Sequence, residues 1–240
     1  VSVPESGDSA KGRGQVNFSG DHTKLVVGQG VTARIHAADD GRLLQQWRES
    51  SAVSAIAVTP NGAALVVGHI GAQNNTALLT FSLERLIEAH DGAVHSLTFN
   101  ANDNSLVSGG DDKMARLWTV ADGTLQRTFG GCEGPVTSVA ITQDGTRIVG
   151  GSADKTVRQW LMNPPAGEQP SDTVAPMSTV TLKSLVHSLS VSVDNLKLAV
   201  ATEDHMVQVL DLADGHQLQR FADHVQPAVG VAFASSSQTL

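Results

Sequence analysis

Four residues between positions 90 and 118 carry an imidazole, a hydroxyl, a carboxylate and an indole, which are groups found in hydrolytic centres. They are His90, Ser108, Asp112 and Trp118. A catalytic role would need an exposed serine with its base beside it and an oxyanion site. A structural role is the alternative, because buried polar groups must be paired and a closed hydrogen-bonded network fixes the register of the strands that carry it. The elements that position these residues decide between the two roles.

A second set of polar residues recurs at matching places along the chain. His95 and His187 each follow a valine, Thr137 takes the same place between them, and Asp111 and Glu203 each precede a turn aspartate. Histidine and carboxylate side chains together favour a cationic or pH-sensitive partner. No metal site is expected, because the two histidines lie two repeat units apart and no ligand pair stands at i, i+2 or i, i+4. Solvated turn residues without a role are the alternative.

The elements follow from an internal repeat. Six times, an apolar residue is followed seven positions later by another, with a polar turn between, and the intervals are 40, 41, 42, 50 and 42 residues. The pairs are Phe18/Leu25, Val58/Leu65, Phe99/Leu106, Ile141/Ile148, Val191/Leu198 and Phe233/Leu240. Short strand-like units at this period predict an all-β fold, a β-propeller of four-stranded antiparallel blades.

One unit illustrates the expected blade. Residues 93–99 form a first strand, residues 100–104 a turn, and further strands begin at Leu106, Lys113 and Leu125. Asp-Gly turns precede the fourth strand of three units and stand six residues before an aromatic residue, at Trp47, Phe129 and Phe221. Such turns join strands into a meander. We expect blades to start near residues 15, 52, 93, 135, 185 and 228, within a propeller segment of residues 15–240, and residues 1–14 to end a preceding blade or form a linker.

The third strands carry a recognisable motif. Residues 108–118, S-G-G-D-D-K-M-A-R-L-W, resemble the S-G-x-x-D-x-x-x-R-x-W line of WD-repeat (WD40) propellers. Residues 151–160 and 204–211 resemble it as well, with Leu210 in place of Trp in the last. The resemblance covers residues 15–240. It implies that His90, Ser108, Asp112 and Trp118 form a structural network that links the inner strands of a blade, and no catalytic residue is expected.

The same resemblance implies a role. In WD-repeat propellers, the positions of His95, Asp111, Thr137, His187 and Glu203 open toward the narrower face around the central channel, where partners often dock. We therefore expect a non-catalytic scaffold for a protein or peptide partner, with no cofactor. The alternative is an accessory propeller of a larger multidomain enzyme or redox protein whose catalytic part lies outside this chain.

Two departures from the motif lead to further expectations. Cys132 and Gly150 take the His and Ser positions of the network in the next unit, so that blade is expected to rely on packing. Residues 162–177 contain four prolines, which remove backbone donors, so an exposed loop is expected there. Five complete units and part of a sixth are present, whereas closed propellers of this family commonly have seven blades. We expect a segment of a longer ring, in a style that resembles bacterial members.

Composition excludes some classes. Lys and Arg number 16 against 24 Asp and Glu, which disfavours a broad nucleic-acid footprint. No apolar run approaches the roughly 18 residues of a membrane span. The single cysteine excludes a disulfide framework and a CxxC zinc site within this sequence.

Overall fold

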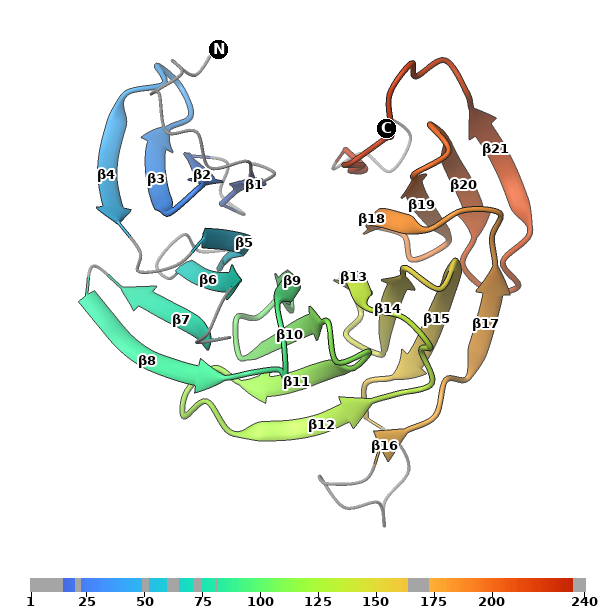
Figure 1. Ribbon diagram of the computed structural model, residues 1–240, viewed down its shortest axis with the longest axis horizontal. Helices are drawn as coiled ribbons and strands as arrows, with labels where there is room; N and C mark the ends of the chain where they lie inside the picture. The colour runs from blue at the N-terminus through green and yellow to red at the C-terminus, as the bar shows by residue number, and fades with distance from the viewer. Residues whose placement is uncertain are drawn as a thin grey trace.

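The computed structural model describes residues 15–19, 23–48, 52–59, 65–70, 75–80, 82–163 and 173–234. These residues form five sheets that follow one another along the chain, and no helix is present among them. Figure 1 shows the sheets arranged as blades around a common centre, with the first and the last blade at the two ends of an arc. The expected start of the chain, residues 1–14, lies outside the described residues.

Each blade is an antiparallel meander whose first strand lies nearest the centre. The first two blades consist of β1 (Gln15–Phe18), β2 (Lys24–Gln29), β3 (Thr32–Ala37) and β4 (Leu43–Arg48), then β5 (Ala52–Val58), β6 (Leu65–Ile70), β7 (Asn75–Thr80) and β8 (Ser82–Glu88). The third and fourth consist of β9 (Val94–Phe99), β10 (Ser105–Gly110), β11 (Ala115–Thr119) and β12 (Leu125–Phe129), then β13 (Val136–Ile141), β14 (Arg147–Ser152), β15 (Thr156–Leu161) and β17 (Ser178–Thr181). The fifth consists of β18 (Val186–Val191), β19 (Lys197–Thr202), β20 (Val207–Asp211) and β21 (Gln217–Phe221).

The apolar residues spaced seven apart are direct cross-strand partners in the first hairpin of each blade. The partners are Phe18 with Leu25, Val58 with Leu65, Phe99 with Leu106, Ile141 with Ile148, and Val191 with Leu198. Directly opposite side chains on one face of a sheet interact and fix the register. The sequence repeat is therefore the repeat of a hairpin, and the predicted all-β blade architecture is confirmed. Leu240 of the sixth pair lies outside the described residues.

The Asp-Gly turns have one geometry in three blades. Gly41, Gly123 and Gly215 have φ values of 73°, 71° and 76°, a region that glycine reaches without a Cβ clash. Each glycine N–H donates to a carbonyl four residues earlier, at 2.9–3.0 Å. This shared turn brings the fourth strand back along the third.

The apolar core is divided among the interfaces between successive blades. One cluster joins the second and third blades around Leu106 and Trp118, and the next joins the third and fourth around Phe129 and Trp160. The rings of Phe129 and Trp160 lie 6.0 Å apart between centroids. Each blade thus buries its faces against its neighbours, and the polar loops stay at the rims.

Glycines in the second strands permit this close stacking. A Cβ atom on Gly109 would lie 2.7 Å from Val136 Cγ1, and one on Gly151 would lie 2.4 Å from Val186 Cγ1. Real Cβ atoms do not approach so closely, so a larger residue would push the next blade away. Gly28 and Gly68 occupy the same register position in the first two blades.

One expectation about the chain's course needs correction. Residues 162–177 are not simply an exposed loop: Met162 is buried, and β16 (Thr173–Val174) pairs in parallel with β12 of the preceding blade.

The sixth blade expected to begin near residue 228 stays a prediction, because residues 235–240 lie outside the described residues. The N–H groups of Val231 and Phe233 donate to serine hydroxyls of β18, at 3.3 and 3.0 Å, as the N–H of Leu189 in β18 donates to Ser138 of β13.

Candidate functional site

The third blade brings His90, Ser108, Asp112 and Trp118 into one hydrogen-bonded chain. The indole Nε1–H of Trp118 donates to Ser108 Oγ at 2.9 Å. Ser108 Oγ lies 2.7 Å from His90 Nε2, and His90 Nδ1 lies 2.7 Å from Asp112 Oδ1. The four groups come from the loop before β9, from β10, from the turn after β10 and from β11, so the chain links the three inner strands of the blade.

The partners of His90 and its burial together assign its protonation. A carboxylate can only accept, so His90 Nδ1 carries a proton and donates to Asp112. Burial lowers the pKa of His90 despite the opposing effect of Asp112, which favours the neutral imidazole. Nε2 of the neutral ring then accepts from the Ser108 hydroxyl, which itself accepts from the indole of Trp118.

Asp112 is the acceptor at which several donors meet. Its carboxylate also takes hydrogen bonds from the Arg116 guanidinium and from the backbone N–H of Asp91. Burial raises the pKa of Asp112, but the hydrogen bonds from His90 and Arg116 outweigh it and hold the pKa well below the usual value of 3.8. The charged carboxylate thereby joins the turn after β10 to the loop that enters the blade.

This arrangement does not suit nucleophilic catalysis. Ser108 is fully buried and its hydroxyl already has a donor and an acceptor. A serine nucleophile must be reached by its substrate and needs oxyanion donors beside it. The set has the residue types of a catalytic triad, but its buried hydrogen bonds hold three strands of one blade together. We call these four residues the polar clamp.

The neutral, buried His90 makes stability depend on pH. Its pKa is lower in the folded chain than the ordinary 6.5, so its contribution is complete above pH 6.5 and is lost as the pH falls toward the folded value. We expect the free-energy gap between wild type and His90→Gln to narrow by up to about 1.4 kcal/mol between pH 7.5 and pH 5.5. Urea unfolding at both pH values measures this gap, and a gap that stays constant or widens would contradict a neutral His90.

The fourth blade corrects one expectation. It was expected to rely on packing, because Cys132 and Gly150 replace the His and Ser of the network. The indole of Trp160 instead donates to the carbonyl of Gly130 at 3.0 Å, and a Cβ at Gly150 would lie 2.7 Å from the Trp160 ring. The glycine thus makes room for the indole, and a backbone oxygen replaces the missing hydroxyl.

The acid and its arginine are kept in this blade. Asp154 accepts from the Arg158 guanidinium and from the backbone N–H of Glu133, at 2.7 and 2.8 Å. Burial raises the pKa of Asp154, but its hydrogen bonds with Thr156, Glu133 and Arg158 lower it to about 2. Polar pairing and packing therefore act together in the fourth blade.

The candidate rim residues form two separate pairs. His95 Nε2 lies 2.6 Å from Asp111 Oδ1, and His187 Nε2 bonds Glu203 Oε2. The carboxylate side chains of Asp111 and Glu203 are 44 % and 45 % exposed, whereas that of His187 is only 8 % exposed. In both pairs the histidine is the second residue of a first strand, β9 or β18, so the pairs are equivalent in two blades with one blade between them.

Thr137 lies at the same position in that intermediate blade but has another task. Its hydroxyl lies 2.5 Å from the carbonyl of Val186 in the next blade and 3.1 Å from that of Gly151. Ser54 likewise bonds the carbonyl of Val94 in its next blade. Hydroxyl residues at this position join neighbouring first strands, and the role of Thr137 as a partner contact stays a prediction.

Serines one residue further along join the blades in a way that the sequence analysis missed. The hydroxyl of Ser96 accepts from the N–H of Val139, and that of Ser138 accepts from the N–H of Leu189, both at 3.0 Å. A serine stands at this position in three first strands and could have been noticed in the sequence. The role of the serine depends on the neighbouring blade, which the pattern within one strand does not reveal.

One group of potential metal ligands comes together among the described residues. Ligand atoms of Asp211, Asp214 and His216 all lie within 4.8 Å of one another. They belong to an exposed turn in which His216 Nδ1 lies 2.6 Å from Asp214 Oδ1 and Asp211 accepts the N–H of Ala213. Local hydrogen bonds account for this cluster.

Comparison with known proteins agrees with the blades. Residues 81–119 and 123–160 each match the family model described as WD domain, G-beta repeat. Each match begins near the outer strand of one blade and ends in the third strand of the next, from β8 to β11 and from β12 to β15. A repeat of this kind ties neighbouring blades together, and residues 81–160 carry two repeats of the WD-repeat family.

One relative is WD repeat domain-containing protein 83 of Danio rerio. It is 43 % identical over 49 residues, which make up 20 % of this chain and 16 % of that protein. The match therefore spans about a sixth of the relative's length. Among the described residues there is no helix long and apolar enough to cross a membrane.

Proposed function

We propose that this chain is a non-catalytic scaffold whose partner, a protein or peptide, docks at His95, Asp111, His187 and Glu203. WD40 repeats generally mediate protein–protein interaction, which supports the general role. The observation that carries the specific proposal is the equivalent placement of two imidazole–carboxylate pairs in two blades, each with a half-exposed acid.

The chemistry of the pairs favours a cationic contact. A carboxylate has two oxygens and about four lone-pair directions. The histidine occupies one of them in each pair, and at Asp111 the backbone N–H of Ala93 occupies a second, at 3.1 Å. The remaining directions at Asp111 and Glu203 can accept from Lys or Arg of a partner, and Arg can do so with two parallel bonds. The chain's net charge of −8 would assist the approach of a basic segment.

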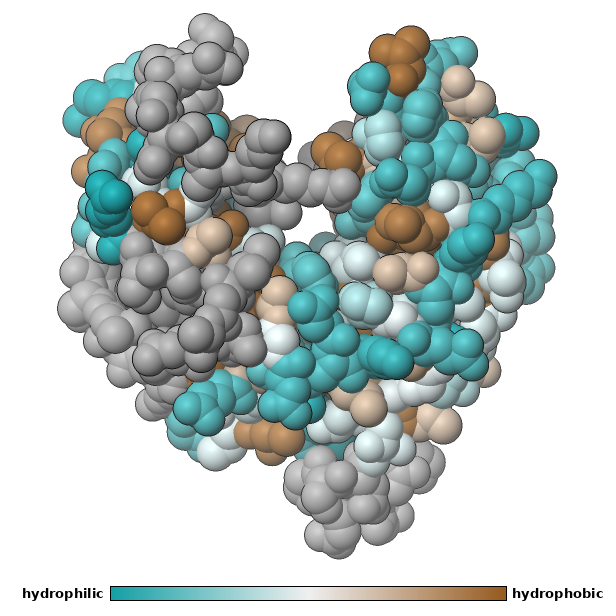
Figure 2. All heavy atoms as spheres, in the orientation of Figure 1, coloured by the Kyte–Doolittle hydropathy of each residue, from teal (hydrophilic) through white to brown (hydrophobic). Residues whose placement is uncertain are grey.

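The character of the visible surface is compatible with polar recognition. Figure 2 shows one face of the molecule, on which hydrophilic residues lie over much of the described surface and hydrophobic residues stand in separate small groups. Recognition at such a surface depends on a few charged and hydrogen-bonding residues together with shape.

A four-residue variant tests the proposal. We expect the variant with His95→Ala, Asp111→Asn, His187→Ala and Glu203→Gln to lose at least about tenfold in affinity for captured partners, because two charge contacts are removed. Wild type and variant are compared by quantitative affinity capture from extracts of the source cells, followed by titration of the proteins that wild type retains.

The control carries the same types of change at exposed positions elsewhere in the fold. Its substitutions are His216→Ala, His224→Ala, Asp122→Asn and Glu88→Gln. Both variants are checked for folding by circular dichroism before capture. Equal retention of every partner by wild type and by the four-residue variant would refute docking at these residues.

A further inference from the structure

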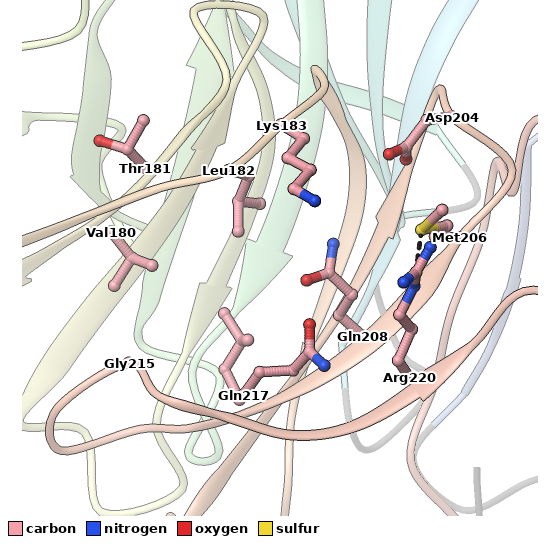
Figure 3. A pocket seen from close by; sticks show the side chains of 11 residues that line it. Val180, Thr181, Leu182, Lys183, Asp204, Met206, Gln208, Gly215, Gln217 and Arg220 are labelled. Atoms are coloured by element: carbon pink, nitrogen blue, oxygen red, sulfur yellow. Dashed lines mark hydrogen bonds between the residues drawn. The ribbon is translucent and has the colours of Figure 1, made fainter.

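A groove of about 250 Å³ lies between β17 of the fourth blade and strands β20 and β21 of the fifth (Figure 3). The apolar lining residues are the less exposed ones, and the cationic ones stand in solvent. The groove is lined by Val180, Leu182, Leu210, Gln208, Lys183 and Arg220, among others.

The matching space between the third and fourth blades is filled by the chain itself. There, β16 lies in parallel along β12, and the N–H of Gly130 donates to the carbonyl of Val174 at 3.1 Å. The side chain of Val174 packs against the cluster that contains Phe129 and Trp160. An extended segment thus adds a strand to the outer edge of a blade and inserts one small apolar side chain between two blades.

Strand register makes the two spaces equivalent. Phe129 pairs with Ala115 on β11 as Val180 pairs with Val157 on β15, so Val180 takes the place of Phe129. Leu210 on β20 lies opposite Leu198 on β19, as Trp160 on β15 lies opposite Ile148 on β14, so Leu210 takes the place of Trp160. Val180 and Leu210 both line the groove, and Thr181 follows Val180 as Gly130 follows Phe129.

The fifth blade supplies no corresponding segment among the described residues. Its third and fourth strands are joined by the short Asp214-Gly215 turn, whereas β16 comes from the long connection of the fourth blade. A Cβ on Gly215 would lie 2.3 Å from Val180 Cγ2, so this turn closes one end of the groove. In the part of the chain that the structure describes, β17 is the last strand of its sheet.

We propose that this groove binds an extended peptide segment of a partner protein by strand addition to β17. The segment runs parallel to β17, accepts a hydrogen bond from the N–H of Thr181, and places a small apolar side chain between Val180 and Leu210. An exposed strand edge with an adjoining side-chain pocket is the general requirement for such binding.

The cationic side chains of the groove favour a peptide with an acidic residue next to the small apolar one. Among the described residues, neither Lys183 nor Arg220 forms an ion pair, and Arg220 Nε contacts only Met206 Sδ, at 3.0 Å. The lining also holds one acid, Asp204, which accepts from Thr202 Oγ1 at 2.5 Å, so two cations stand against one carboxylate and the net charge of the lining is positive. A carboxylate of the peptide would therefore meet two cations with free donors.

The probe is a fluorescein-labelled peptide with the sequence of residues 170–177, Pro-Ser-Asp-Thr-Val-Ala-Pro-Met, which includes β16 and an aspartate. Its binding to the whole chain is followed by fluorescence anisotropy. We expect saturable binding that the Lys183→Glu/Arg220→Glu variant weakens by at least about tenfold. The variant Thr181→Pro removes the N–H and should abolish binding.

Matched controls separate this groove from other sites. Arg42→Glu/Lys113→Glu makes the same charge change at exposed positions away from the groove and should leave binding unchanged. A peptide with Lys in place of Val should not bind, because the space between Val180 and Leu210 cannot hold a charge. A peptide with Lys in place of Asp should bind the charge-reversed variant better than wild type.

The outcomes are decisive in both directions. The proposal fails if wild type shows no saturable binding up to millimolar peptide, or if groove and control variants behave alike, as they would if the peptide displaced β16 from β12. It rests on the general peptide-binding role proposed above but uses a separate surface. The four-residue rim variant should therefore bind this peptide as wild type does, so failure of one site leaves the other intact.

Discussion

Replacement of Trp118 by alanine is expected to lower the free energy of unfolding by about 3–5 kcal/mol. Trp118 is 6 % exposed and packs in the cluster between the second and third blades. Its removal leaves a cavity between blades and takes away the donor to Ser108. Equilibrium urea unfolding followed by circular dichroism measures the difference.

A second substitution separates packing from hydrogen bonding. Trp118→Phe retains most of the ring but removes the indole N–H, so its cost should be about 1–3 kcal/mol and smaller than that of alanine. A loss below about 1 kcal/mol for Trp118→Ala would mean that the indole is not part of a buried network.

Replacement of Asp112 by alanine should cost about 3–5 kcal/mol, because it breaks a partly buried charge network. The guanidinium of Arg116, the Nδ1–H of His90 and the N–H of Asp91 all lose their shared acceptor. The loss should be greatest near neutral pH. The depressed pKa of Asp112 means that its contribution exists above about pH 4 and disappears as the pH falls through the folded value.

Asp144→Ala is the matched control for this substitution. Asp144 also accepts a backbone N–H, from Thr146 at 3.0 Å, but it lies in an exposed turn and its hydrogen-bond donors are neutral groups of that turn, Thr142 and Thr146. Its replacement should cost about 1 kcal/mol or less. Equal losses for Asp112→Ala and Asp144→Ala would contradict the clamp assigned to Asp112.

Much of the fold could be predicted because its signals are local. The Phe99/Leu106 pair marks a hairpin, since its members are opposite residues separated by one turn. The Asp122-Gly123 turn marks the next hairpin, since glycine adopts φ 71° without strain. The four network residues could be predicted only through their resemblance to a known motif, because nothing local joins His90 to Ser108.

The remaining features depend on neighbouring blades and could not be predicted from local patterns. Gly109 looks like a turn residue, but its small size matters because Val136 of the next blade lies over it. Thr173 and Val174 stand among prolines that predicted a loop, yet their backbone finds the free edge of β12. Gly130 was not a candidate, because a carbonyl that replaces a serine hydroxyl leaves no trace in the side-chain sequence.

The contacts of the candidate rim residues also could not be predicted from local patterns. His95 and His187 were predicted as candidate residues from their aligned positions, but the sequence did not show that each would pair with the acid of its own blade. Thr137 shares their position and uses its hydroxyl between blades instead. Residue type at one repeated position decides between a contact within the blade and a link to its neighbour.

The claim that a buried polar clamp, and not a catalytic centre, organises the third blade can be tested by indole hydrogen exchange in NMR. The chain has three tryptophans. The indole N–H groups of Trp118 and Trp160 donate inside the protein, at 2.9 and 3.0 Å. Trp47, on the outer strand β4, is half-buried against the core between the first two blades. We predict strong protection of the Trp118 and Trp160 signals and faster exchange of the Trp47 signal. Exchange of the Trp118 indole as fast as that of Trp47 would contradict the clamp and return Ser108 to the list of accessible nucleophiles.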